Sequence, residues 1–417
     1  MTVIDLGDLR GDDAAPDTVP RPPRAVGRPF RVAVALLVAL VTLAAAAPPA
    51  RSGPVTIPGG TGASAFLSDD RVYVVRRAAS APGWDLVAYR VGRERWRARV
   101  DGVDDVVAVW EQGGRVLAVG PAGNGARWET TVFDAGTGAL RWRQDGVVFP
   151  AGDALLLRPS GGPGSQSVRR LAVADGRTLW TVPTTGRDVQ FSHGRSGVDR
   201  ILLLPAAGET VVLDAATGAR LAARDLHPGE VPGARAMQGA GRLFLETRLA
   251  GDVVTAFEMD TLRPRWTAEL PLVGDLEPCG SLLCAGRQTG GMWALDPATG
   301  AVRWASDLWS SVLRAEGGRL LVAAGREGGE GLSVLDGTDG RLIAEVGDWD
   351  VLPQGESGDR LFLTRPLGSD RRLLAEPDLS GDPPVVRDVL TGTDCTVGRV
   401  LLVCRERGGD FTVRRLP

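Results

Sequence analysis

The chain contains almost none of the residues on which enzyme active sites usually depend. It has no lysine, so all 48 basic side chains are arginines, and it has two histidines, His193 and His227. A phosphate-binding loop needs its lysine, and a multi-histidine metal site or a set of Ser-His dyads needs more histidines. Neither a Gly-x-Ser-x-Gly elbow nor a His-Glu-x-x-His motif occurs. We therefore expect no catalytic residue, no metal ligand and no cofactor, and interpret the protein as a non-enzyme.

The chain also lacks a large excess of charge of either sign, and its formal net charge is only -3. A balance this small predicts neither a nucleic acid nor an acidic membrane surface as a partner. The exclusive use of arginine indicates the coding bias of a GC-rich bacterial genome. The alternative is an arginine-rich surface that binds anions.

One long apolar run is present, at residues 32–47, and arginines at positions 21–31 precede it. Its length is at the short end for a spanning helix, and the flanking charges place the N-terminus in the cytoplasm. We expect a disordered cytoplasmic tail at 1–31, a transmembrane signal anchor at 32–48 and a linker at 49–64. The alternative is a cleaved signal peptide and a secreted protein, although the charged lead is unusually long for one.

Downstream of the linker, one short motif recurs along the chain. Residues 295–304 read Leu-Asp-Pro-Ala-Thr-Gly-Ala-Val-Arg-Trp, and residues 133–142 are an imperfect copy. The aspartate favours a turn because its carboxylate can bind backbone amides, and the glycine supplies the positive φ that hairpin loops need. The motif therefore predicts a β-hairpin that ends in a large buried ring.

A second hairpin, marked by an aliphatic run, precedes each copy, so that the unit has about forty residues and several strands, as in a propeller blade. Such units begin near nine positions: Arg71, Arg115, Asp153, Arg200, Arg242, Ser281, Arg319, Arg360 and Arg399. We predict an all-β fold in residues 65–417, a β-propeller of four-stranded blades closed by an N-terminal strand. Eight blades is the preferred number, with seven and nine as alternatives.

The repeated polar residues are interpreted as structural, because one ring does not need several copies of an active site. The predicted turn residues are Asp134, Gly138, Asp175, Gly176, Asp214, Gly218, Asp260, Asp296, Gly300, Asp336 and Gly340. The tryptophans that end the units should cover the seam to the next blade. These predicted packing residues are Trp96, Trp142, Trp180, Trp266 and Trp304.

The four cysteines form two local pairs, Cys279 with Cys284 and Cys395 with Cys404. An exported domain lies in an oxidising compartment, so disulfides are expected, with a turn inside each pair to bring the sulfurs together. Metal binding is the alternative, but the spacing is not that of a zinc knuckle and no histidine lies beside either pair.

The tails of the units, strand-Asp-x-x-Thr-Gly-x-x-x-Trp, resemble the pyrroloquinoline-quinone-like propeller repeat over about residues 65–417. That repeat is shared by quinoprotein alcohol dehydrogenases and by non-catalytic propellers such as the Bam-type outer-membrane assembly lipoprotein. The dehydrogenases of the family carry adjacent cysteines and a calcium ion, whereas here no two cysteines are adjacent and Asn124 is the one asparagine. The resemblance to the non-catalytic branch implies a membrane-anchored extracytoplasmic module that binds a protein or cell-envelope partner. The alternative is an oxidoreductase that uses pyrroloquinoline quinone and calcium.

Overall fold

The computed structural model describes residues 53–79, 82–160, 167–194, 196–205, 208–226, 235–239, 243–247, 253–325, 330–354, 360–369 and 371–416. The chain divides into two compact units, Met1–Gly53 and Pro54–Pro417. The expected tail at 1–31 and anchor at 32–48 lie outside the described residues. Among the residues that are described, no helix has the length and apolar character needed to cross a membrane.

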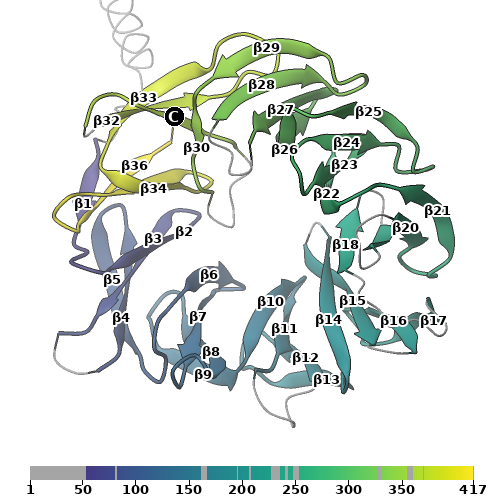
Figure 1. The fold of residues 1–417 in the computed structure, drawn as a ribbon. Coiled ribbons are helices and arrows are strands. Elements are labelled where there is room, and N and C mark those ends of the chain that lie inside the picture. The colour runs from purple at the N-terminus through teal and green to yellow at the C-terminus, as the bar shows by residue number, and fades with distance from the viewer. Residues whose placement is uncertain are drawn as a thin grey trace, which may run out of the picture. The chain divides into compact units, whose positions relative to one another are not determined.

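The unit Pro54–Pro417 is all-β in its described part, as predicted, and its strands follow one another as blades (Figure 1). The first blades are β2 (Ser64–Ser68), β3 (Arg71–Arg77), β4 (Trp84–Arg90) and β5 (Arg93–Val100); β6 (Ala108–Gln112), β7 (Arg115–Ala122), β8 (Arg127–Asp134) and β9 (Leu140–Asp145); β10 (Val147–Ala151), β11 (Ala154–Arg158), β12 (Ser167–Ala172) and β13 (Thr178–Pro183); and β14 (Arg187–Gly194), β15 (Gly197–Pro205), β16 (Glu209–Asp214) and β17 (Arg220–Asp225).

The following blades are β18 (Arg235–Gly239), β19 (Leu243–Thr247), β20 (Val253–Glu258) and β21 (Pro264–Glu269); β22 (Val273–Cys279), β23 (Leu282–Arg287), β24 (Met292–Leu295) and β25 (Val302–Ser306); β26 (Trp309–Glu316), β27 (Arg319–Ala324), β28 (Glu330–Asp336) and β29 (Leu342–Gly347); and β30 (Asp350–Val351), β31 (Leu363–Pro366), β32 (Arg371–Glu376) and β33 (Val385–Thr391). The last blade joins β34 (Thr393–Val397), β35 (Leu401–Arg405) and β36 (Phe411–Arg415) to β1 (Val55–Ile57).

The observed number of blades differs from the predicted number of eight, which is corrected here. The described strands form seven four-stranded sheets and one eight-stranded sheet. The larger sheet holds two blades, β10–β13 and β14–β17, which a single pairing of Ala151 with Gly197 connects. The described strands therefore make up nine four-stranded units. The first and last units do not merge, because β2–β5 is complete by itself and the last blade takes only one strand from upstream of it.

That upstream strand closes the ring, as the sequence predicted. In β1, Val55 pairs with Val413 and Ile57 with Phe411, antiparallel to β36. The side chain of Ile57 is fully buried among residues of the first and last blades. The expected linker at 49–64 is thus corrected at residues 55–57, which are part of the propeller. Pairing the two ends of the chain covers a sheet edge that would otherwise be exposed.

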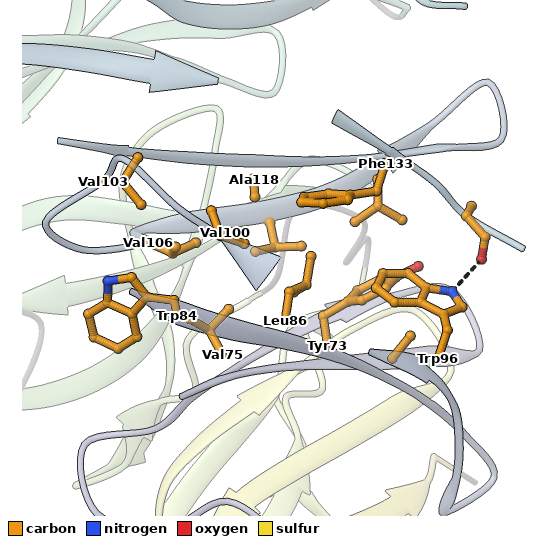
Figure 2. Close-up of a cluster of buried hydrophobic side chains, with 14 of the residues drawn as sticks. Tyr73, Val75, Trp84, Leu86, Trp96, Val100, Val103, Val106, Ala118 and Phe133 are labelled. Carbon is orange, nitrogen blue, oxygen red and sulfur yellow. Dashed lines mark hydrogen bonds between the residues drawn. The ribbon is translucent and has the colours of Figure 1, made fainter. Parts of the chain in front are cut away.

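The blades are buried on both faces, which explains why the second strand of a blade is an aliphatic run, as in β7 and β11. In β3, Tyr73 and Val75 pack toward the β6–β9 blade, in a cluster that includes Phe133 (Figure 2). The alternate residues Val72 and Val74 pack toward the last blade. Successive side chains of a strand point to opposite faces of the sheet. A blade that packs between two neighbouring blades therefore needs apolar residues on both of its faces.

Candidate functional site

The repeated turns gather on one face of the propeller, which we call the turn face. It carries the described connections between the first and second strands of a blade and between the third and fourth; the last blade lacks the latter, because its fourth strand is β1. The two connections are bonded to each other: Ala135 N donates to Gly114 O at 3.1 Å, and Gly337 N to Gly318 O at 2.8 Å. In these two blades the loops of the turn face are therefore braced against each other.

The aspartate of a regular turn organises its own loop. Asp134 Oδ1 accepts hydrogen bonds from the backbone of Gly136 and Thr137 and from the Thr137 hydroxyl, each at 3.1 Å. The hydrogen bond from Arg141, together with those from the loop, lowers the pKa of Asp134 to about 2, although desolvation opposes the shift. Asp214 and Asp336 accept the same kind of bonds from their loops, and Gly138, Gly218, Gly300 and Gly340 all have φ between 72° and 73°.

Two of the predicted turn acids have other positions. Asp175 lies three residues beyond the position that corresponds to Asp134, and there it accepts a hydrogen bond from Arg177 N at 3.0 Å. In the β20–β21 turn the acid in the place of Asp134 is Glu258, which Thr261 and Arg265 contact, while Asp260 faces the preceding blade. Leu262 takes the glycine position there with φ 53°. The spacing to the following tryptophan, and not the nearest Asp, identifies the turn acid.

The five predicted tryptophans lie across the seams between blades. Each indole N–H donates to a carbonyl in the third-to-fourth-strand turn of the next blade, as Figure 2 shows for Trp96. The distances are 2.9 Å for Trp96 to Ala135, 3.1 Å for Trp142 to Val173, 3.2 Å for Trp180 to Ala216, 2.9 Å for Trp266 to Pro297 and 3.0 Å for Trp304 to Gly337. The strand register places Ala222, Ala344 and Asp388 at the equivalent position in three other blades.

A second inter-blade contact was not predicted. An arginine at the start of the second strand reaches the turn of the next blade: Arg71 donates to Ala135 O at 2.9 Å, and Arg200 to Asp260 at 2.6 Å. Arg71 also pairs with Glu111 at 3.1 Å. The signal was in the sequence, because an arginine often starts the aliphatic run of a unit, but a residue pattern does not tell which blade its side chain contacts.

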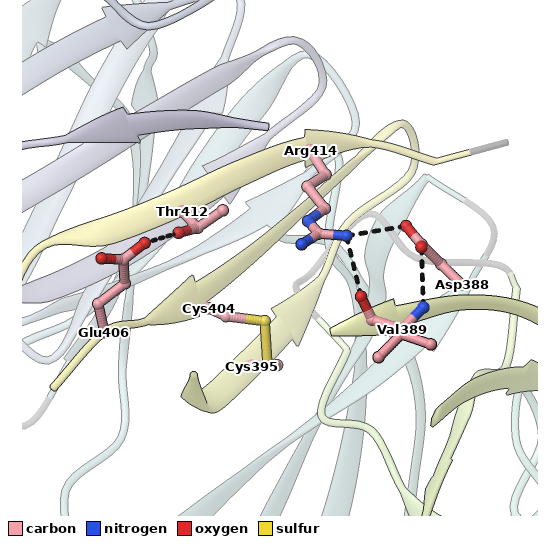
Figure 3. The surroundings of a disulfide bond; sticks show 7 residues. All are labelled: Asp388, Val389, Cys395, Cys404, Glu406, Thr412 and Arg414. Carbon is pink, nitrogen blue, oxygen red and sulfur yellow. Dashed lines mark hydrogen bonds and ion pairs between the residues drawn. A yellow bond between two sulfur atoms is a disulfide. The ribbon is translucent and has the colours of Figure 1, made fainter. Parts of the chain in front are cut away.

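Both cysteine pairs form disulfides between the first and second strands of one blade. Cys279 and Cys284 have Cα atoms 5.7 Å apart, and the turn between them contains Gly280 with φ 72°. Cys395 and Cys404 have Cα atoms 4.0 Å apart, in the blade that closes the ring (Figure 3). All four cysteines are buried and bonded, so none is a metal ligand. Beside the second disulfide, Arg414 pairs with Asp388 at 3.0 Å across the seam.

The turn face is hollowed at one irregular seam, between the β26–β29 and β30–β33 blades. This seam hollow has a volume of about 610 Å³, and residues of the β26–β27 and β32–β33 connections line it. Glu376 stands where a regular turn has aspartate and accepts bonds from Arg360 at 2.8 Å and Arg387 at 2.6 Å. Desolvation would raise the pKa of Glu376, but the bonds from the two arginines lower it more. The hollow is the candidate binding site.

The residues that the structure describes do not fit a quinone with its calcium ion. Among the residues that the structure describes, no group of three or more His, Cys, Asp or Glu side chains is placed to hold a metal ion. Each disulfide joins two cysteines that are separated in the sequence, and no two cysteines of the chain are adjacent. We therefore derive no chemical step through that cofactor.

The chain was compared with known proteins. No curated protein matches the chain. Among solved structures, BamB from Moraxella catarrhalis is 15% identical with a TM-score of 0.42, over 88% of this chain and 97% of that one. A quinohemoprotein alcohol dehydrogenase from Comamonas testosteroni is 15% identical with a TM-score of 0.41, over 68% of this chain and 65% of that one.

The fold alone is shared with a eukaryotic initiation factor, which is 11% identical with a TM-score of 0.55, over 84% of this chain and 92% of that one. A family model matches the sequence itself, in three overlapping stretches at residues 90–257, 164–283 and 250–364. Together these stretches span more than half of the chain. The chain therefore belongs to the family described as outer membrane protein assembly factor BamB.

Proposed function

We propose that the protein is a non-enzymatic binding or scaffold module of the cell envelope, and that it holds a protein partner on its turn face. The observation that carries the proposal is the seam hollow, which has a volume of about 610 Å³ and is lined by charged side chains. At this seam the tryptophan contact and the aspartate turn of the repeat are replaced. Braced loops on a rigid ring are a common platform for recognition. The family description, which names an assembly factor, supports the same class of function.

The proposed location is outside the cytoplasm, with residues 32–48 as a signal anchor and residues 1–31 in the cytoplasm. The two disulfides support this location, because disulfides persist in oxidising compartments and are rare in the cytosol. Secretion after cleavage is the alternative. Fractionation of cells that carry a C-terminal tag distinguishes the two, since an anchored chain stays with the membrane after high-salt and carbonate washes.

The function is tested by gentle detergent extraction of the tagged full-length protein, followed by mass spectrometry of the proteins that co-purify. We expect one stoichiometric protein partner. A propeller that is recovered alone, and that binds pyrroloquinoline quinone saturably in the presence of calcium, would contradict the proposal and favour the oxidoreductase alternative. The matched control is an unrelated tagged protein with the same anchor segment.

A further inference from the structure

The inference starts from Arg319, which occupies a position that is used for inter-blade contact elsewhere. In the strand register Arg319 pairs with the turn acid Asp336, as Arg115 pairs with Asp134. Arg115 donates to Ala174 O of the next blade at 3.4 Å, and Arg200, at the same position of another blade, to Asp260 at 2.6 Å. The fold thus directs this arginine toward the turn of the following blade.

At the seam hollow the acid of that turn bonds to other arginines. Glu376, the acid of the next turn, accepts from both Arg360 and Arg387. Arg319 lines the hollow, and within the described residues it forms no ion pair or hydrogen bond, apart from a longer-range interaction with Asp336. A guanidinium carries five N–H donors in a planar fork that suits a carboxylate. Arg319 therefore lies where other blades have a bridging arginine, but among the described residues no bond to the next blade holds its guanidinium.

The charge of the hollow selects the kind of anion. Its lining holds four arginines and three acidic side chains, so that its net charge is +1. One carboxylate would neutralise this charge, whereas a phosphate monoester, with a charge of about -1.5 to -2 at pH 7, would overcompensate it beside Glu316 and Asp378. The balance favours a carboxylate over a phosphate.

Apolar side chains beside the arginines indicate that the carboxylate belongs to a polypeptide. Leu361, Leu379 and the exposed Val385 line the same hollow. We propose that the seam hollow binds an acidic segment of the protein partner, with one Asp or Glu carboxylate on Arg319 and a neighbouring apolar residue against Val385. This inference rests on the proposed function and assigns the chemistry of the partner.

Binding of short labelled peptides to the full-length protein in mild detergent tests the inference. Three peptides differ at one residue between two leucines, which is aspartate, asparagine or phosphoserine. We expect the aspartate peptide to bind at least about tenfold more tightly than the other two, and Arg319→Gln to remove about tenfold of its affinity, as expected for a charge-assisted hydrogen bond. Arg93→Gln is the matched control, because Arg93 is exposed on the turn face of another blade and loses the same charge.

Three results would overturn the inference: equal binding of the aspartate and asparagine peptides, tighter binding of the phosphoserine peptide, or equal losses in the two arginine variants. Absence of saturable binding up to about 5 mM, beyond the weakest specific affinities, would overturn it too. A failure of this inference can be distinguished from a failure of the proposed function. If the Arg319→Gln protein still co-purifies its partner in full yield, the scaffold function stands and the acidic-segment inference falls.

Discussion

The indole of Trp96 lies across Gly138 of the next blade so closely that no side chain fits between them. A Cβ atom on Gly138 would be 2.6 Å from Cε3 of Trp96. The same clearance is 2.7 Å for Gly176 and Trp142, and 2.4 Å for Gly300 and Trp266. The glycine of the repeat is therefore required twice, for its positive φ and for the ring that covers it.

Gly138→Ala should destabilise the protein more than Gly114→Ala. Both glycines have positive φ, 73° and 72°, but nothing lies within 4 Å of a Cβ on Gly114. We expect about 1 kcal/mol for Gly114→Ala from the backbone alone and about 2–4 kcal/mol for Gly138→Ala, where overpacking adds to it. Urea unfolding measures both, and equal losses would show that the indole contact is not tight.

The bridging arginines should stabilise the seams that they cross. Arg71→Gln removes the bonds to Glu111 and Ala135 O and should cost about 1–2 kcal/mol, since the side chain is one quarter exposed and solvent screens part of the interaction. Arg319→Gln, at the same position of another blade, should change the unfolding free energy by less than about 0.5 kcal/mol. Denaturant unfolding of the two variants checks the difference. A loss at Arg319 as large as at Arg71 would mean that Arg319 bridges its seam after all.

Ring closure by β1 is tested at Ile57. Ile57→Ala should cost about 2–5 kcal/mol, because the side chain is fully buried where the two ends of the propeller meet. The exposed neighbour Thr56 serves as the control, and Thr56→Ala should change stability by less than about 0.5 kcal/mol. Thermal unfolding of the two variants side by side would contradict closure by this strand if Ile57→Ala were as mild as Thr56→Ala.

Asp134 makes stability depend on pH in acid. Its pKa is lowered to about 2, chiefly by Arg141, whereas an unfolded aspartate titrates near about 3.9. A lowered pKa stabilises the fold above the unfolded value, and this contribution is lost as the pH falls through the folded value. The difference in unfolding free energy between wild type and Asp134→Asn should therefore shrink between about pH 4 and pH 2. Unfolding measured across this range would contradict the account if the difference stayed constant.

The repeat was enough to predict the all-β propeller because its turn residues act within their own loop. An Asp that binds loop amides and a Gly with positive φ define a hairpin wherever they occur, as at Asp134 and Gly138. The tryptophans were predicted to cover seams, and they lie there. The number of blades was not fixed in this way, because it depends on which strand pairs with β36 at the two ends of the chain.

The candidate site, in contrast, could not be predicted from the repeat. The hollow arises where the repeat is broken, at Ala344 and Glu376, and a broken repeat has no signature of its own. Asp175 and Asp260 were assigned to the turn by residue type, yet the register places other residues at the position of the turn acid. Arg319 has the same sequence context as Arg115. Only the contacts across the seam distinguish the arginine that bridges from the arginine that does not.

Site-specific photo-crosslinking in intact cells tests the central claim most directly. A photoreactive residue replaces Val385, which is 42% exposed in the seam hollow, or Leu308, which is 70% exposed between β25 and β26 at the other end of the strands. The account predicts that the Val385 variant crosslinks to one protein partner, that the Leu308 variant does not, and that Arg319→Gln weakens the crosslink. A partner captured only from Leu308, or captured equally from both positions, would contradict binding at the turn face.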